Sequence, residues 1–205
     1  MDIRITQALP LLRAVGDRNG EATTLNNIGL VYDDLGEKQK ALNYYDQALP
    51  LLRAVGDSPE ERLRQRGGEA TTLSNIAFTK SNLGNLTEAL TDIQSAIEIV
   101  EDLRSKIGSQ DLRASYFATV QHHYKLYIDL LMQLHQQNPN EGYDVLALHI
   151  SERSRARSLV ELLTEANANI RQGVDPQLLE KEQNLLQQLN AVEQARHELV
   201  SGQYD

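Results

Sequence analysis

The sequence predicts an all-α protein in which antiparallel helix pairs stack as a solenoid and end in long helices. The first observation is that the segment QALPLLRAVGD occurs twice, at residues 7–17 and 47–57. The second is that GEATTL also occurs twice, at 20–25 and 68–73. The third is that apolar residues around both segments follow helical and not strand spacing. Internal repeats of about this length are typical of helical repeat arrays.

The two repeat offsets, 40 and 48 residues, show where an insertion lies. They differ by eight residues, which places extra sequence at 58–66, between the two halves of the repeated text. The inserted SPEERLRQR is polar and contains a proline, and we expect either a loop or a short helical extension. Residues 1–107 therefore divide into a partial repeat at 1–17, a repeat at 20–57, the insertion at 58–66 and a repeat at 68–107.

The first full repeat has the pattern of two packed helices. Small and large apolar residues share one face of its first helix at i, i+3, i+4, i+7 spacing: Leu25, Ile28, Gly29 and Tyr32. Leu35-Gly36 is expected to end this helix, because glycine tolerates the left-handed conformation common at helix ends. The second helix has a similar inner face, formed by Ala41, Tyr45 and Ala48.

The second repeat keeps this pattern with substitutions. Its inner positions are Leu73, Ile76, Ala77, Ala89, Ile93 and Ala96, with Leu83-Gly84 between the helices. Asn85 followed by Glu88 resembles a capping box. Lys80 replaces the aromatic residue of the first repeat, so we expect this edge to be more solvated.

The sequence over about 6–103 resembles the tetratricopeptide repeat family. The resemblance rests on Leu-x2-Ile-Gly-x2-Tyr at 25–32, followed by Ala-x3-Tyr at 41–45. The second repeat departs from the family pattern at Ala77, Lys80 and Ile93. The resemblance implies a right-handed solenoid whose concave groove binds peptides.

Two prolines fall inside predicted helices. Pro10 and Pro50 each lack a backbone donor and clash with the carbonyl four residues earlier. We predict a kink or an early helix end at both positions.

The second half continues with long helices. Residues 110–166 predict a helical hairpin that extends the solenoid. Its first helix has an apolar stripe made of Tyr116, Val120, Tyr124, Tyr127, Leu130, Leu131 and Leu134. In its second helix the residues predicted to face inward are Val145, Leu148, Ser151, Leu159 and Leu162.

A last helix is predicted over 174–201, starting at Asp175-Pro176. It has apolar residues at heptad spacing: Leu178, Leu185, Val192 and Leu199, with Leu189 between. This stripe fits a coiled-coil hairpin, docking against a partner, or self-association through 178–199.

Residues 143–163, above all SERSRARSL at 151–159, resemble the helical stretch upstream of CHAT domains. These caspase-like domains follow tetratricopeptide arrays in cyanobacteria and other bacteria. The family's catalytic His and Cys lie further downstream and match no position here, since the sequence has no Cys. The resemblance implies a sensor part that acts on a CHAT-like domain in cis or in trans.

The residues predict no enzyme, metal or cofactor. There is no Gly-x-Ser-x-Gly elbow and no glycine-rich phosphate loop. His122-His123 are adjacent and point apart on a helix, and His149 with Glu152 lack further ligands. Catalytic, cofactor-binding and metal-binding residues are therefore expected to be absent.

Charge and hydropathy exclude other partners. The net charge of −9 argues against nucleic acid. We interpret Arg62, Arg64 and Arg66 as a solvated loop, and Arg153, Arg155 and Arg157 as an ion-pair network with Glu152 and Glu161. No apolar run approaches membrane-spanning length, and we expect a cytoplasmic protein.

What remains is a binding groove lined by the first helix of each repeat. The residues left to face it in the two repeats are Thr23, Asn26, Asn27, Leu30, Asp33 and Asp34, and Thr71, Ser74, Asn75, Phe78, Ser81 and Asn82. Asn27 and Asn75 could clamp a peptide backbone, because an amide both donates and accepts hydrogen bonds. The alternative is that they bond neighbouring helices. The sequence thus predicts a non-catalytic scaffold that binds a protein or peptide, neutral or mildly basic.

Overall fold

The computed structural model describes residues 3–54, 58–106 and 110–170, together with 175, 177–178, 180–181 and 184–185. These residues contain seven α-helices and no strand. The all-α prediction is confirmed. No helix within this part of the chain combines the length and apolar character needed to cross a membrane.

The helices follow one another with short connections. They are α1 (Ile3–Val15), α2 (Arg18–Asp34), α3 (Lys38–Arg53), α4 (Pro59–Asn82), α5 (Leu86–Lys106), α6 (Gln110–Gln137) and α7 (Tyr143–Ile170). The chain forms two compact units, Met1–Glu161 and Leu162–Asp205. The first unit contains α1 to α6 and most of α7.

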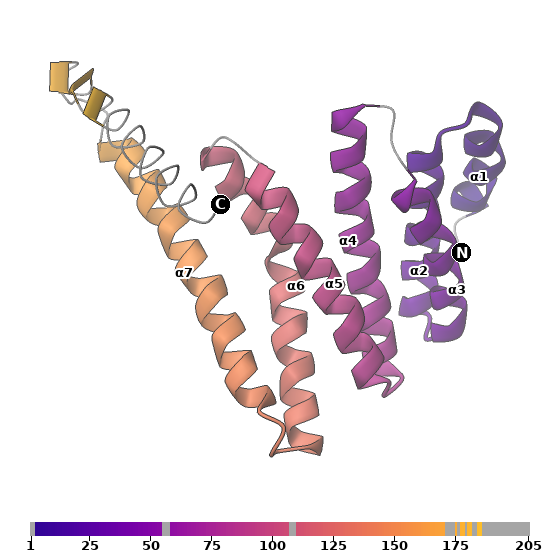
Figure 1. The fold of residues 1–205 in the computed structure, drawn as a ribbon. Helices are drawn as coiled ribbons and strands as arrows, with labels where there is room; N and C mark the ends of the chain where they lie inside the picture. Colours follow the sequence, from indigo (N-terminus) through magenta and orange to yellow (C-terminus); the bar gives the residue numbers. More distant parts are fainter. Residues whose placement is uncertain are drawn as a thin grey trace, which may run out of the picture. The chain divides into compact units, whose positions relative to one another are not determined.

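Within the first unit, α2 to α6 lie side by side in chain order (Figure 1). The most extensive packing joins α2 to α3 and α4 to α5, which are the helix pairs of the two repeats. The first helices also touch each other, because α2 contacts α4 and α4 contacts α6. One face of the stack is therefore built from α2, α4 and α6.

Both predicted helix ends are confirmed. Gly36 and Gly84 have φ of +77° and +83°. The amide after each glycine donates to the carbonyl five residues earlier, Glu37 to Tyr32 and Asn85 to Lys80, both at 2.9 Å. This is a Schellman arrangement, which satisfies the last carbonyls of α2 and α4.

The core of the first repeat depends on Gly29. A Cβ at this position would lie 2.4 Å from Cε1 of Tyr45, whose side chain is fully buried. In the second repeat the equivalent positions hold Ala77 and Ile93, both fully buried. The narrower isoleucine accompanies the added methyl group, so each pair keeps the two helices in close contact.

The outer edge of each repeat has a different contact. In the first repeat the rings of Tyr32 and Tyr44 stack, with centroids 5.3 Å apart. The equivalent pair in the second repeat, by the offset of 48, is Lys80 and Asp92, whose Nζ and Oδ2 lie 2.8 Å apart. Lys80 also pairs with Glu88 at 3.1 Å. The predicted solvated edge is thus wrong, since the lysine is half-buried and its charge is paired.

Neither proline ends its helix, so the predicted early ends are wrong. α1 runs past Pro10 to Val15, and α3 runs past Pro50 to Arg53. Both prolines are exposed. A carbonyl that loses its helical donor on an exposed side can bond to water, which lowers the cost of the proline.

The insertion forms the beginning of α4. Of the two predicted alternatives, a loop or a short helical extension, the structure has the helical extension. Ser58 caps the helix by accepting a hydrogen bond from the Glu61 amide at 3.0 Å, and Pro59 occupies the first turn. Arg62, Arg64 and Arg66 are therefore on a helix, and the loop predicted for them is wrong.

Of the two apolar faces predicted for the long helices, the one on α6 is confirmed and the one on α7 is wrong. Tyr124, Tyr127, Leu130, Leu131 and Leu134 of α6 are buried. On α7, however, Ala147 and Ile150 join the core, whereas the predicted inward residues Val145 and Leu148 are exposed. The helix has apolar residues on both sides, so spacing alone selected the wrong face. The Ser151 side chain is half-buried, and those of Leu159 and Leu162 lie outside the described residues.

Candidate functional site

The twelve predicted groove residues divide by burial. Asn26, Asp33 and Ser74 are buried, and Asn75 and Ser81 are partly buried. The remaining residues are exposed: Thr23, Asn27, Leu30, Asp34, Thr71, Phe78 and Asn82. We call the exposed residues of α2, α4 and α6 on this side of the stack the first-helix face.

The buried members connect neighbouring repeats instead of facing solvent. Oδ1 of Asn26 accepts hydrogen bonds from Thr72 Oγ1 at 3.1 Å and from Asn75 Nδ2 at 3.0 Å. Oδ1 of Asp33 accepts from Thr79 Oγ1 at 2.6 Å, and its Oδ2 accepts from Lys38 Nζ at 2.9 Å. The outward orientation predicted for Asn26 and Asp33 is therefore wrong, because both bind side chains of the packed helices.

The two predicted clamp residues have different surroundings. Asn75 donates to Asn26, so its amide is partly used between α2 and α4. Asn27 is exposed on α2. The structure thus places Asn75 in the interhelical role considered as the alternative, and leaves Asn27 on the surface.

Large apolar side chains occupy equivalent exposed positions on the first-helix face. Leu30 of α2 is 40% exposed and Phe78 of α4, at the offset of 48, is 49% exposed. Lys38 Nζ lies 6.0 Å from the centre of the Phe78 ring. The face therefore has an apolar centre with a cation at its edge.

α6 extends this face, which the sequence did not indicate. Ser81 Oγ lies 3.5 Å from Gln133 Oε1, which places Gln133 beside the end of α4. The preceding residue, Met132, is 39% exposed. The repeated text stops before α6, so only the contact between α4 and α6 identifies Met132 as a member of the face.

Comparison with known families identifies the repeats. Two tetratricopeptide repeat models match the chain, one at residues 4–54 and the other at 70–103. These segments are tetratricopeptide repeats. A search of curated proteins found no match. Tetratricopeptide repeats are generally protein–protein interaction modules and typically non-catalytic scaffolds.

The histidines near the tetratricopeptide repeats do not assemble a metal site within the described residues, where no group of three potential ligands occurs. His123 is buried, and burial followed by the neighbouring His122 lowers its pKa to about 3. His149 and Glu152 are both exposed on α7.

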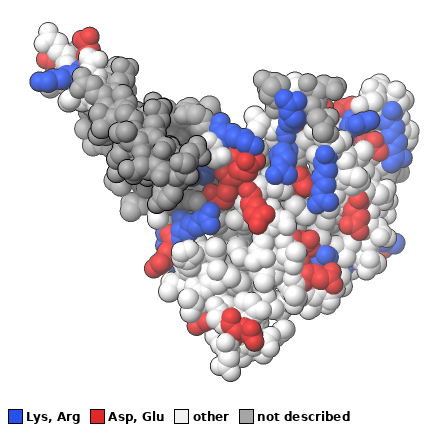
Figure 2. Space-filling view, in the orientation of Figure 1, with Lys and Arg blue, Asp and Glu red and all other residues white. Residues whose placement is uncertain are grey.

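Charged residues of the tetratricopeptide repeats are distributed unevenly. In Figure 2, Lys and Arg side chains gather over the upper part of α4 and the helices before it, and Asp and Glu side chains gather nearer α5 and α6. Arg153 pairs with Glu101 of α5 at 3.5 Å. The side chain of Glu161, one of the predicted partners, lies outside the described residues. The Arg157 side chain lies outside the described residues.

Proposed function

We propose that the chain is a non-catalytic scaffold that binds a peptide segment of a partner protein across the first-helix face. The observation that carries this proposal is the exposure of Leu30 and Phe78 at equivalent positions of adjacent tetratricopeptide repeats. Met132 continues the same apolar centre on α6. A peptide with apolar side chains at matching intervals would bury all three.

The polar residues around this centre define the rest of the ligand. The exposed amide of Asn27 can donate to and accept from the ligand's backbone without reading its side chains. Asp34 is exposed two turns further along α2, which favours a neutral or mildly basic peptide. Lys38 of α3, at the edge of this face, is already paired with Asp33.

A displayed peptide library selected on the folded protein tests the proposal. We expect selected peptides to be apolar, and the double variant Leu30→Ser/Phe78→Ser to bind them about tenfold or more weakly. Leu63→Ser is the matched control, because Leu63 is 45% exposed on α4 within the insertion. Equal losses in both variants, or a library that yields no binder, would contradict peptide binding at this face.

Asn27→Ala tests the backbone clamp separately. We expect it to weaken binding of unrelated selected peptides by a similar factor, about threefold to tenfold, with unchanged helicity. Asn75→Ala is less informative, because it also removes the hydrogen bond to Asn26. Unchanged affinity in Asn27→Ala would exclude the clamp and leave the apolar contact to be judged by the first experiment.

A second candidate is a regulatory role next to a CHAT-like protease domain, in cis or in trans. It rests on the resemblance of 143–163 and on the exposure of Leu178 and Leu185, at 60% and 58%. The other heptad positions, Leu189, Val192 and Leu199, lie outside the described residues. An immunoblot of source-cell extract tests the cis form. A band tens of kilodaltons above 23.0 kDa supports it, and a band at 23.0 kDa contradicts it.

A further inference from the structure

The joint before each full repeat contains the same ion pair. Arg13 Nε lies 2.6 Å from Glu21 Oε1 at the first joint, and Arg53 Nε lies 2.8 Å from Glu69 Oε1 at the second. The packing is repeated as well. A Cβ on Gly20 would approach Leu12, and a Cβ on Gly68 would approach Leu52. The two joints are therefore two copies of one local structure.

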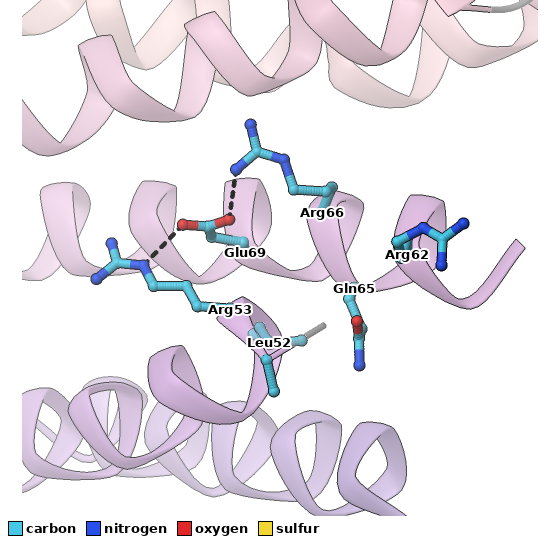
Figure 3. A pocket seen from close by; sticks show the side chains of 7 residues that line it. Leu52, Arg53, Arg62, Gln65, Arg66 and Glu69 are labelled. Carbon is cyan, nitrogen blue, oxygen red and sulfur yellow. Dashed lines mark hydrogen bonds and ion pairs between the residues drawn. The ribbon is translucent and has the colours of Figure 1, made fainter. Parts of the chain in front are cut away.

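The second joint has a second ion pair and one further arginine. Arg66 Nη1 bonds to the other oxygen of Glu69, also at 2.8 Å. Arg62 and Gln65 come from the insertion and lie on the turn of α4 before Arg66 (Figure 3). Together with Leu52, Arg53 and Ala54 these residues line a pocket of about 400 Å³. At the first joint Arg18 occupies the position equivalent to Arg66, but the described ion pair there is that of Arg13 with Glu21.

Arginines outnumber carboxylates among the residues that line this pocket. Three guanidinium groups and one carboxylate line it, although the whole chain has a net charge of −9. The Glu69 side chain is only 6% exposed, whereas those of Arg53 and Arg66 are 56% and 43% exposed. A buried carboxylate thus holds two solvent-accessible guanidiniums in fixed positions.

This arrangement leaves donors for a ligand. A guanidinium has five N–H donors. Arg53 and Arg66 each use one of these donors in the hydrogen bond to Glu69. Pre-positioned arginines bind carboxylate and phosphate through paired hydrogen bonds, and lose little side-chain entropy on doing so. Leu52 and Ala54 supply an apolar wall for the carbon atoms that carry the anion.

We propose that this pocket binds an oxyanion, a carboxylate or phosphate group carried by an acidic peptide segment of a partner. The site is separate from the first-helix face in the residues that form it. Its ligand also differs in chemistry from the apolar, neutral or mildly basic segment proposed for that face.

Three labelled peptides of otherwise uncharged sequence test the proposal by fluorescence anisotropy. One contains two adjacent phosphoserines, the second contains two glutamates and the third contains two serines at the same positions. We expect the first or second to bind and the serine peptide not to bind. Which acidic peptide binds more tightly identifies phosphate or carboxylate as the ligand group.

Variants locate the binding. Arg66→Gln should weaken the acidic peptide about fivefold to tenfold, with Glu69 still paired to Arg53. Arg64→Gln is the matched control, because it removes the same charge from an exposed residue of the same helix that does not line the pocket. We expect it to change the affinity less than about twofold. Equal weakening by both variants, or no binding of either acidic peptide to the native chain, overturns the proposal.

Discussion

At the residue scale, Gly29 decides how closely α2 and α3 approach. Its missing side chain leaves the space that the Tyr45 ring fills, and that ring is fully buried. Burial, and then the negative charge of Asp33, raise the pKa of the Tyr45 hydroxyl. The ring therefore has neither room to move nor a tendency to ionise.

Gly29→Ala should destabilise the protein by about 1–3 kcal/mol. The steric overlap of the new methyl group with the buried ring costs more free energy than the higher helix propensity of alanine offsets. Gly67→Ala on α4 is the control, since a Cβ there meets nothing within 4 Å. We expect this control to be neutral or stabilising by up to about 1 kcal/mol. Urea midpoints measure both, and a neutral Gly29→Ala would contradict the packing described here.

His123 gives the stability a dependence on pH. Its folded pKa of about 3 lies below the ordinary value of 6.5. The unfolded chain therefore binds a proton first as the pH falls, and the free energy of unfolding decreases from pH 6.5 towards pH 3. The slope for one group is at most about 1.4 kcal/mol per pH unit.

We expect His123→Leu to remove this contribution while keeping the core filled. Urea unfolding at about pH 7 and about pH 5 measures it, because carboxylates common to all variants cancel in the comparison. His149→Leu, at an exposed position on α7, should keep the native slope. If His123→Leu retains that slope too, the acid sensitivity comes from another group.

At the element scale, the insertion lengthens α4 without disturbing the repeat that follows. Removing Ser58–Gln65 joins Asp57 to Arg66-Gly67-Gly68-Glu69, which matches Asp17-Arg18-Asn19-Gly20-Glu21 at the first joint. At that joint Asp17 Oδ1 caps α2 by accepting from the Gly20 amide at 2.8 Å. The shortened chain thus has a complete helix start available.

We expect the variant lacking Ser58–Gln65 to unfold cooperatively with lower total helicity, because α4 loses its first turns. Circular dichroism during thermal unfolding measures both properties. Deletion of Leu73–Lys80 is the control, since it removes the same length from the repeat itself and should abolish cooperative folding. Loss of cooperativity in the first variant would show that the insertion is part of the repeat core.

The sequence predicts elements that depend on local spacing. Gly36 and Gly84 end helices because of their own backbone conformation, and the stripe of α6 follows from its apolar period. The sequence does not predict side-chain orientations that depend on contacts with residues far away in the chain. Asn26 and Asp33 are polar and were expected on the surface, but their partners Thr72 and Thr79 lie on another helix. The prediction that Leu148 faces the core was wrong for the same reason. α7 has a second apolar side, which includes Ile150, and contacts with other helices decide which side is buried.

At the scale of the whole molecule, polar contacts between α2 and α4 join one repeat to the next. Thr79 donates to Asp33 in a buried position, and Thr72 and Asn75 donate to Asn26. In a repeat protein, stability depends on such contacts between neighbours as well as on each repeat itself. These contacts therefore determine whether the two repeats unfold together.

Thr79→Val should cost about 1–2 kcal/mol, because it removes a buried hydrogen bond while Lys38 still pairs with Asp33. Thr71→Val is the control, since the exposed Thr71 hydroxyl donates to the Gly67 carbonyl of its own helix. Hydrogen exchange should rise in α2 and α3 more than in α6. Equal rises in all three helices would contradict a local link between the repeats.

The two copies of the outer-edge contact also respond differently to the solution. Tyr32 and Tyr44 stack through apolar surface. Burial lowers the pKa of Lys80, but the hydrogen bonds and negative charges of Asp92 and Glu88 together raise it above its ordinary value. Dissolved sulfate strengthens the aromatic contact, because it is excluded from apolar surface. The same ions screen the lysine pair and weaken it. The same edge of two duplicated repeats thus has opposite salt dependences, and salinity shifts the relative strength of the two contacts.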